Sequence, residues 1–156
     1  MVACILVFIF AALASPGSAR AQADNPNAVA LLATLERSGY NYSKVSEGLW
    51  ELSFTGQNLK QFNVRILVTD DLAVIFVKLA DRRDLQMGTP ELVKLMELND
   101  QFDSVKLALS NDMLYMRVDV HARLIDEQEL KYLVQQMADA VDETYPHVKP
   151  YIVGKE

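Results

Sequence analysis

The sequence predicts a single α+β domain in which helices pack on a mainly antiparallel sheet. Six short segments are typical of strands, because their apolar residues either alternate with polar ones or run continuously, and most are separated by turns of hairpin length. Three longer segments repeat apolar residues at helical spacing. The 156 residues, 51% hydrophobic and 23% charged, fit one globular domain, and the segments follow the order α-β-β-β-β-α-β-β-α.

The chain begins with an uncharged, strongly apolar segment at residues 2–14, which small residues follow. This layout is typical of a secretory signal peptide, although no Lys or Arg precedes the apolar part. We therefore predict a signal peptide over residues 1–21, with Ala-x-Ala sequences that allow cleavage after Ala21 or after Ala23. The segment is shorter than the roughly 20 residues of a spanning helix, so we expect a periplasmic or secreted protein without a permanent membrane anchor.

The mature domain is predicted to cover residues 24–150, before a short C-terminal tail at 151–156. Its first helix follows a polar cluster that offers N-cap residues, and Gly39 ends it, as a glycine after a helix commonly does. The apolar residues of this helix recur at helical spacing, at Val29, Leu32 and Leu35.

An antiparallel meander is predicted after the first helix. Residues 40–45, 49–55 and 62–69 alternate in polarity and are separated by short polar turns. Trp50 lies on the apolar face of the second of these segments. The single tryptophan is therefore predicted to lie in the core.

A fourth strand is predicted at residues 72–79, after a tight acidic turn. Both of its faces are apolar, which is typical of a central strand that is covered on one side and contacts something on the other. Its neighbours should be the third strand and a later one. Ile75, Val77 and Leu79 share one face, and we take them as candidate protein-binding residues, with burial beneath a helix as the alternative.

A second helix is predicted to begin at Thr89, a candidate N-cap that precedes Pro90, and to end near Asn99. Its expected buried residues are Leu92, Leu95 and Met96.

The last hairpin and the last helix complete the domain. Residues 105–109 and 113–123 alternate in polarity around a polar turn. The helix starts after Asp126, which forms an acidic variant of the capping box with Glu129, and ends at Pro146. Its expected buried residues are Leu130, Leu133, Val134, Met137, Val141 and Tyr145.

Charge and residue types exclude several functions. Without residues 1–21 the chain carries 14 basic and 21 acidic side chains, a net charge of −7, and no basic patch, so we expect no nucleic-acid partner. It also lacks cysteine, so its apolar core alone must stabilise it. No motif typical of a metal, nucleotide or other cofactor site is present, and none is expected.

Polar residues on the predicted strand 113–123 offer a catalytic alternative. Arg117, Asp119, His121 and Arg123 fall on one of its faces, and an Asp beside a His can orient a general base. Alternating charges are, however, also typical of the solvent-facing side of an antiparallel strand. Because no nucleophile or further metal ligand accompanies the pair, we predict no catalytic residues.

The pattern of aromatic, apolar and turn residues resembles a known family. It reads Gly39-Tyr40-x-Tyr42, then Val45-x-Glu47-Gly48-x-Trp50-x-Leu52-x-Phe54, an acidic turn and the strand LAVIFVKL. This is similar to the YbjN family, described as sensory transduction regulators, over residues 28–145. The resemblance implies a fold like that of type III secretion chaperones, which are dimers that hold extended protein segments, and it implies no active site.

We therefore expect a non-enzymatic, exported protein-binding domain, chaperone-like or regulatory, that forms a homodimer. An exposed face or edge of its sheet would bind a protein partner by strand addition. The alternative is a periplasmic carrier of a small molecule or lipid, with an apolar pocket between helices and sheet. A hydrolase centred on Asp119 and His121 would need a nucleophile that the sequence does not supply.

Overall fold

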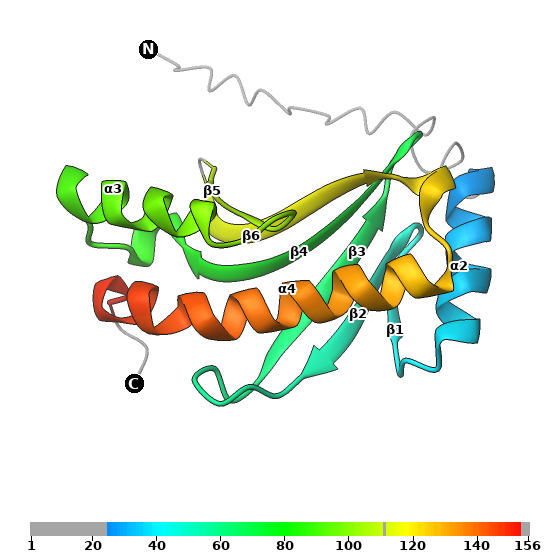
Figure 1. The fold of residues 1–156 in the computed structure, drawn as a ribbon, viewed down its shortest axis with the longest axis horizontal. Helices are drawn as coiled ribbons and strands as arrows, with labels where there is room; N and C mark the ends of the chain where they lie inside the picture. Colours follow the sequence, from blue (N-terminus) through cyan, green and yellow to red (C-terminus); the bar gives the residue numbers. More distant parts are fainter. Residues whose placement is uncertain (1–24, 111, 154–156) are drawn as a thin grey trace, which may run out of the picture.

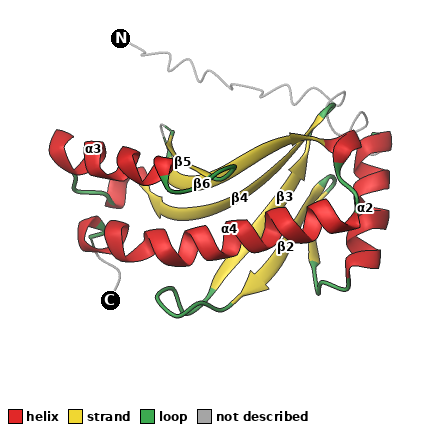
Figure 2. Ribbon diagram, viewed as in Figure 1, coloured by secondary structure: helices red, strands yellow, loops and turns green. Residues whose placement is uncertain are grey.

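The computed structural model describes residues 25–110 and 112–153. The predicted signal peptide and both of its cleavage sites lie outside the described residues. Within the described part of the chain, three α-helices pack on a six-stranded sheet (Figures 1 and 2). This confirms the predicted α+β class and the predicted order of elements.

The sheet is antiparallel throughout, with the strand order β1-β2-β3-β4-β6-β5. The fourth strand lies between the third strand and a later one, as its two apolar faces predict. The strands are β1 (Ser43–Ser46), β2 (Leu49–Phe54), β3 (Phe62–Val68), β4 (Leu72–Asp81), β5 (Lys106–Leu109) and β6 (Met113–His121).

The three helices have different positions on the sheet. The long helix α4 (Glu127–Val148) lies across one face, and α2 (Pro26–Ser38) packs against its N-terminal half (Figure 1). The short helix α3 (Thr89–Glu97) projects at the opposite end (Figure 1). None of the helices in the described residues is long and apolar enough to span a membrane.

The core fills the space between α4, α2 and the sheet face that they cover. Trp50 is 2% exposed there, which confirms its predicted place. Alternate residues of β2, β3, β4 and β6 and the predicted stripe of α4 supply most of the other core side chains. The largest fully buried ones are Leu31, Leu35, Leu52, Ile66, Ile75, Leu114, Met116, Leu130 and Met137.

Helix α2 has the predicted caps but a different buried stripe. Asn25 accepts a hydrogen bond from the backbone N–H of Asn27 at 2.9 Å, and Gly39 ends the helix with a positive φ of 79°. Val29 belongs to the apolar stripe predicted from helical spacing, yet it is 62% exposed. The helix is rotated so that Ala28, Leu31 and Leu35 face α4 and the sheet instead.

Helix α3 differs from its prediction at both its start and its buried face. Gly88 is the N-cap rather than Thr89, and the Glu91 carboxylate accepts a hydrogen bond from its backbone N–H at 3.0 Å. Leu95 is buried as expected, but Met96 is 70% exposed. Leu92, also expected to be buried, is only half-buried, because α3 lies beyond the end of the sheet (Figure 1).

Helix α4 continues through Pro146 to Val148, although Pro146 was predicted to end it. A proline inside a helix leaves the carbonyl four residues earlier without its usual partner. Here the side-chain amide of Asn58, in the β2–β3 loop, donates to that carbonyl of Asp142 at 3.1 Å. A contact from a distant loop therefore compensates for the proline.

Candidate protein-binding surface

The two faces of the sheet differ in burial. On β3, Val64 and Ile66 point toward α4 and are fully buried, whereas Arg65 and Leu67 point away and are half-buried. Within the described residues no helix covers that second face, named here the open face.

The predicted binding residues on β4 lie on the wrong side. Ile75, Val77 and Leu79 are 0%, 1% and 7% exposed and belong to the core, so they do not form a surface. The accessible residues of this strand are Val74 and Phe76, on its other face. Both faces of β4 are apolar, and only the position of α4 decides which one is buried.

An apolar patch lies on the open face across β2, β3 and β4. Leu49 is paired with Leu67, and Leu67 is paired with Val74, so the three side chains form a row across neighbouring strands. Phe76 lies beside this row, opposite Arg65. All four side chains are only half-buried. They are named the open-face patch.

Ion pairs flank the open-face patch. Arg65 donates to Glu51 from Nε at 2.7 Å on one side. On the other side Arg117 donates to Asp119 at 2.6 Å and lies over the ring of Tyr115, 5.9 Å from its centroid. The hydrogen bond to Asp119 raises the pKa of Arg117 above its ordinary value, so the guanidinium stays charged.

The carboxylate of Asp119, weighed from the sequence as a partner of His121, bonds Arg117 instead. His121 lines a shallow groove of about 390 Å³ with Asn27, Asp71 and Arg123. The described residues bring no three His, Cys, Asp or Glu side chains together at a site that could hold a metal ion. The geometry thus offers binding contacts on this face rather than a catalytic constellation.

Both outer edges of the sheet are obstructed. At β5, the side chain of Asn99 accepts from the Leu107 backbone N–H at 2.6 Å and donates to the Leu107 carbonyl at 3.2 Å. At β1, an irregularity between Lys44 and Ser46 disturbs the strand, and the charge of Lys44 lies on the edge. Bulges and lysines are common devices against edge pairing, so the open face is the better binding surface.

Other hollows of the surface are small or polar. A groove of about 90 Å³ lies beside α3 and is lined by Leu85, Met87, Leu92, Leu109 and the charged Arg82. It is smaller than the roughly 300–1,000 Å³ typical of pockets for small molecules. A larger groove of about 300 Å³ lies between β3 and β4 and has cationic side chains on its rim.

Some residues of the open face could be predicted from the sequence, but the contact that covers the β5 edge could not. The alternation in β3 indicates that Arg65 and Leu67 share a face. The strand positions of Val74 and Phe76 were recognised, but not their exposure. Nothing in the sequence marks Asn99, because its contact with Leu107 depends on how the chain between α3 and β5 folds back.

The comparisons with known proteins agree with this architecture. A family model described as "T3SS (YopN, CesT) and YbjN peptide-binding chaperone 1", named TY-Chap1, matches residues 62–155. No curated protein sequence matches the chain.

Two solved structures are similar in fold. YbjN from E. coli is 14% identical and superposes with a TM-score of 0.58 over 83% of this chain and 97% of that chain. A chain of the heterodimeric ExoU–SpcU complex from the type III secretion system of Pseudomonas aeruginosa is 16% identical, with a TM-score of 0.53 over 76% of this chain and 97% of that chain. At these identities the likeness shows the shared fold.

Proposed function

Because this chain belongs to the TY-Chap1 family of peptide-binding chaperones, we propose that its open sheet face binds an extended segment of another protein, without catalysis. The open-face patch carries this proposal. It places four apolar side chains on the central strands, where no described element covers them. Contiguous apolar surface rimmed by charged groups is typical of protein-interaction sites.

The surrounding ion pairs support the same use. Glu51–Arg65 and Arg117–Asp119 keep their charged groups satisfied at the rim, so an apolar segment can settle between them without leaving a buried charge unpaired. An extended segment presents a side chain to one face at every second residue, about 7 Å apart, and therefore reaches the patch with two or three side chains.

Replacing Phe76 with Ser is expected to weaken binding of an unfolded polypeptide by about tenfold, because Phe76 is the largest apolar side chain of the patch. The probe is fluorescently labelled, reduced and carboxymethylated α-lactalbumin, and binding is measured by anisotropy. Val29→Ser is the control, since Val29 is an exposed apolar residue on α2, away from the open face.

Urea unfolding must first show that both variants, Phe76→Ser and Val29→Ser, are folded. Equal binding by wild type, Phe76→Ser and Val29→Ser would place the interaction elsewhere. No binding of the probe to the wild type would remove the proposal.

The proposal includes a homodimer formed through α3. Val93 is 49% exposed and Met96 is 70% exposed on this helix, beside the partly exposed Leu109. A second copy that packed its own α3 here would cover these side chains on both protomers, as two-fold interfaces do. We expect the molar mass measured by light scattering to be that of a dimer for the wild type and to fall to one chain in Met96→Asp, while Val29→Asp leaves it unchanged. A monomeric wild type at micromolar concentration contradicts this part.

Export to the periplasm or the medium is also part of the proposal. The apolar segment at residues 2–14 and the Ala-x-Ala sequences before residues 22 and 24 support it. The intact mass of the protein recovered from the cell envelope measures it, since an exported chain lacks residues 1–21 or 1–23. A full-length mass would contradict export.

A further inference from the structure

The sheet is split on its open face between β3 and β4, and we propose that this split is an anchor groove for one apolar side chain and a neighbouring acidic side chain of an extended partner segment. The inference rests on the proposed function and specifies the chemistry of its partner.

The split begins where the pairing of the two central strands ends. Their register runs from Val68 and Ala73 to Arg65 and Phe76, and no further pair joins them in the described residues. β3 continues along β2 as far as Phe62, and β4 continues along β6 (Figure 1). Within this unpaired stretch the register of β4 with β6 shifts between Lys78 and Ala80, and irregularities of this kind bend a strand.

The floor of the groove is apolar. The groove has a volume of about 300 Å³, which is about ten times the volume that one water molecule occupies in liquid water. This is enough for one aromatic side chain. The floor consists of side chains from both strands, from the β2–β3 loop, from α4 and from the C-terminal segment: Leu59, Phe62, Leu79, Tyr145 and Ile152.

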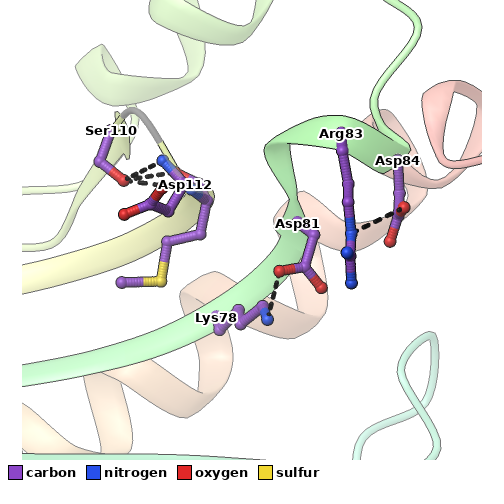
Figure 3. Close-up of polar contacts among 7 residues, drawn as sticks. Lys78, Asp81, Arg83, Asp84, Ser110 and Asp112 are labelled. Atoms are coloured by element: carbon purple, nitrogen blue, oxygen red, sulfur yellow. Dashed lines mark hydrogen bonds and ion pairs between the residues drawn. The ribbon is translucent and has the colours of Figure 1, made fainter. Parts of the chain in front are cut away.

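The rim of the groove is cationic. Arg65 and Lys78 line it together with Asn63 and Gln61, and no carboxylate is among its lining residues. Each cation has one acidic partner: Arg65 bonds Glu51 through Nε, and Lys78 bonds Asp81 at 2.7 Å (Figure 3). Both retain N–H donors beyond these bonds, and the planar fork of a guanidinium suits a carboxylate in particular.

The whole chain has a net charge of −6, whereas the lining of this groove contains two cations, each with N–H donors to spare, and no carboxylate. Another groove, between α4 and the chain that leads into β5, has an acidic rim with Asp103, Asp139 and Glu143 and no cation. An acidic partner segment is therefore attracted to the split and repelled from the helical side of the molecule.

The unpaired backbone edges of β3 and β4 favour an extended polypeptide over a small anion as the occupant of the groove. Beyond Arg65 and Phe76, the facing edges of β3 and β4 carry no strand pairing in the described residues. Such edges accept main-chain hydrogen bonds from an added strand. In the described residues no side chain bonds the backbone of these inner edges as Asn99 bonds that of β5, and Lys78 on β4 lies at the rim of the groove.

Three labelled heptapeptides test the groove on the whole mature domain, all acetylated and amidated so that no terminal carboxylate contributes. Each has a Gly/Ser background, with Phe flanked by two Glu, Phe flanked by two Lys, or Ser flanked by two Glu. We expect the Phe/Glu peptide to bind at least about tenfold more tightly than either of the others, as measured by anisotropy.

Lys78→Glu is expected to weaken binding of the Phe/Glu peptide by about tenfold or more. Lys131→Glu is the matched control, because Lys131 on α4 also pairs with one carboxylate, that of Glu127, and is similarly exposed. Both variants change the net charge equally. If Lys78→Glu does not fold, Lys78→Gln removes the charge without adding a carboxylate beside Asp81, and a loss of about threefold is then expected.

The outcomes separate this inference from the proposed function. Equal affinities for the three peptides, or equal effects of the two Lys→Glu variants, overturn the groove while leaving the open face as a binding surface. Absence of peptide binding by a wild type that binds unfolded α-lactalbumin through Phe76 also overturns the groove alone. Absence of binding to both kinds of probe overturns both proposals.

Discussion

Replacing Ile75 with Ala is expected to lower the free energy of unfolding by about 2–5 kcal/mol, because it leaves a cavity in the core. Ile75 is fully buried on the β4 face that α4 covers. Its neighbour Val74 faces the open side, so Val74→Ala is expected to cost only about 1 kcal/mol. Urea denaturation followed by the fluorescence of Trp50, the single buried tryptophan, measures both.

The comparison tests which face of β4 belongs to the core. Both substitutions occur on one strand and replace a β-branched apolar residue with Ala, so strand propensity changes in a similar way. A larger loss in Val74→Ala than in Ile75→Ala would mean that the open face, and not the face toward α4, is covered in solution.

The second large effect is expected at Asp142, which joins α4 to the β2–β3 loop. Its carboxylate accepts hydrogen bonds from the backbone N–H groups of Gln57, Asn58 and Leu59 at 2.8–3.0 Å. Asp142→Ala removes three charge-assisted bonds, and because the site is partly exposed we expect a loss of about 1–3 kcal/mol of unfolding free energy. Asp139→Ala is the control, since Asp139 is an exposed carboxylate on the same helix that, among the described residues, accepts only from the Gln135 side chain.

The same contact predicts how stability depends on pH. The backbone N–H of Leu59, followed by those of Gln57 and Asn58, lowers the pKa of Asp142 below its ordinary value of 3.8. The folded protein therefore holds the ionised form more strongly than the unfolded chain does. The ionised carboxylate therefore adds to the free energy of unfolding above pH 3.8, and this added stability is lost as the pH falls through the lower pKa of the folded state.

Asp142→Ala should consequently differ most from wild type near neutral pH, and the difference should shrink below pH 3.8. Unfolding free energies measured from pH 7 down to pH 2.5 test this, with Asp139→Ala parallel to wild type throughout. A difference between Asp142→Ala and wild type that stayed constant over this range would show that the carboxylate charge is not the stabilising group.

Patterns that depend on neighbouring residues were predicted well. The alternation around Trp50 identified both β2 and its buried face, and Gly39 marked the end of α2, where the backbone has a positive φ. Asp126 was correctly identified as the N-cap of α4, and it accepts a hydrogen bond from the backbone N–H of Glu129 at 2.8 Å. These features follow from strand and helix periodicity and from local hydrogen bonding.

Features that depend on distant contacts were missed. Pro146 was expected to end α4, because a proline inside a helix loses one backbone hydrogen bond and clashes with the preceding turn. The helix continues because Asn58, more than 80 residues earlier, donates to the carbonyl that the proline leaves free. Met96 was wrongly expected in the core for a similar reason, and Val29 of the apolar stripe of α2 is also exposed. Helical spacing identifies a stripe of residues but not the element that the stripe faces.

The sequence by itself determined the fold class, the order of the elements and the alternation of polar and apolar residues along the strands, because periodicity, turn residues and helix caps act over a few residues. Tertiary structure alone decided which apolar face of β4 is buried and which stays accessible. Ile75 and Val74 are both apolar, β-branched and adjacent, and the path of α4 across the sheet buries the first and leaves the second accessible. The split between β3 and β4 likewise arises from where strand pairing stops, which no segment specifies alone.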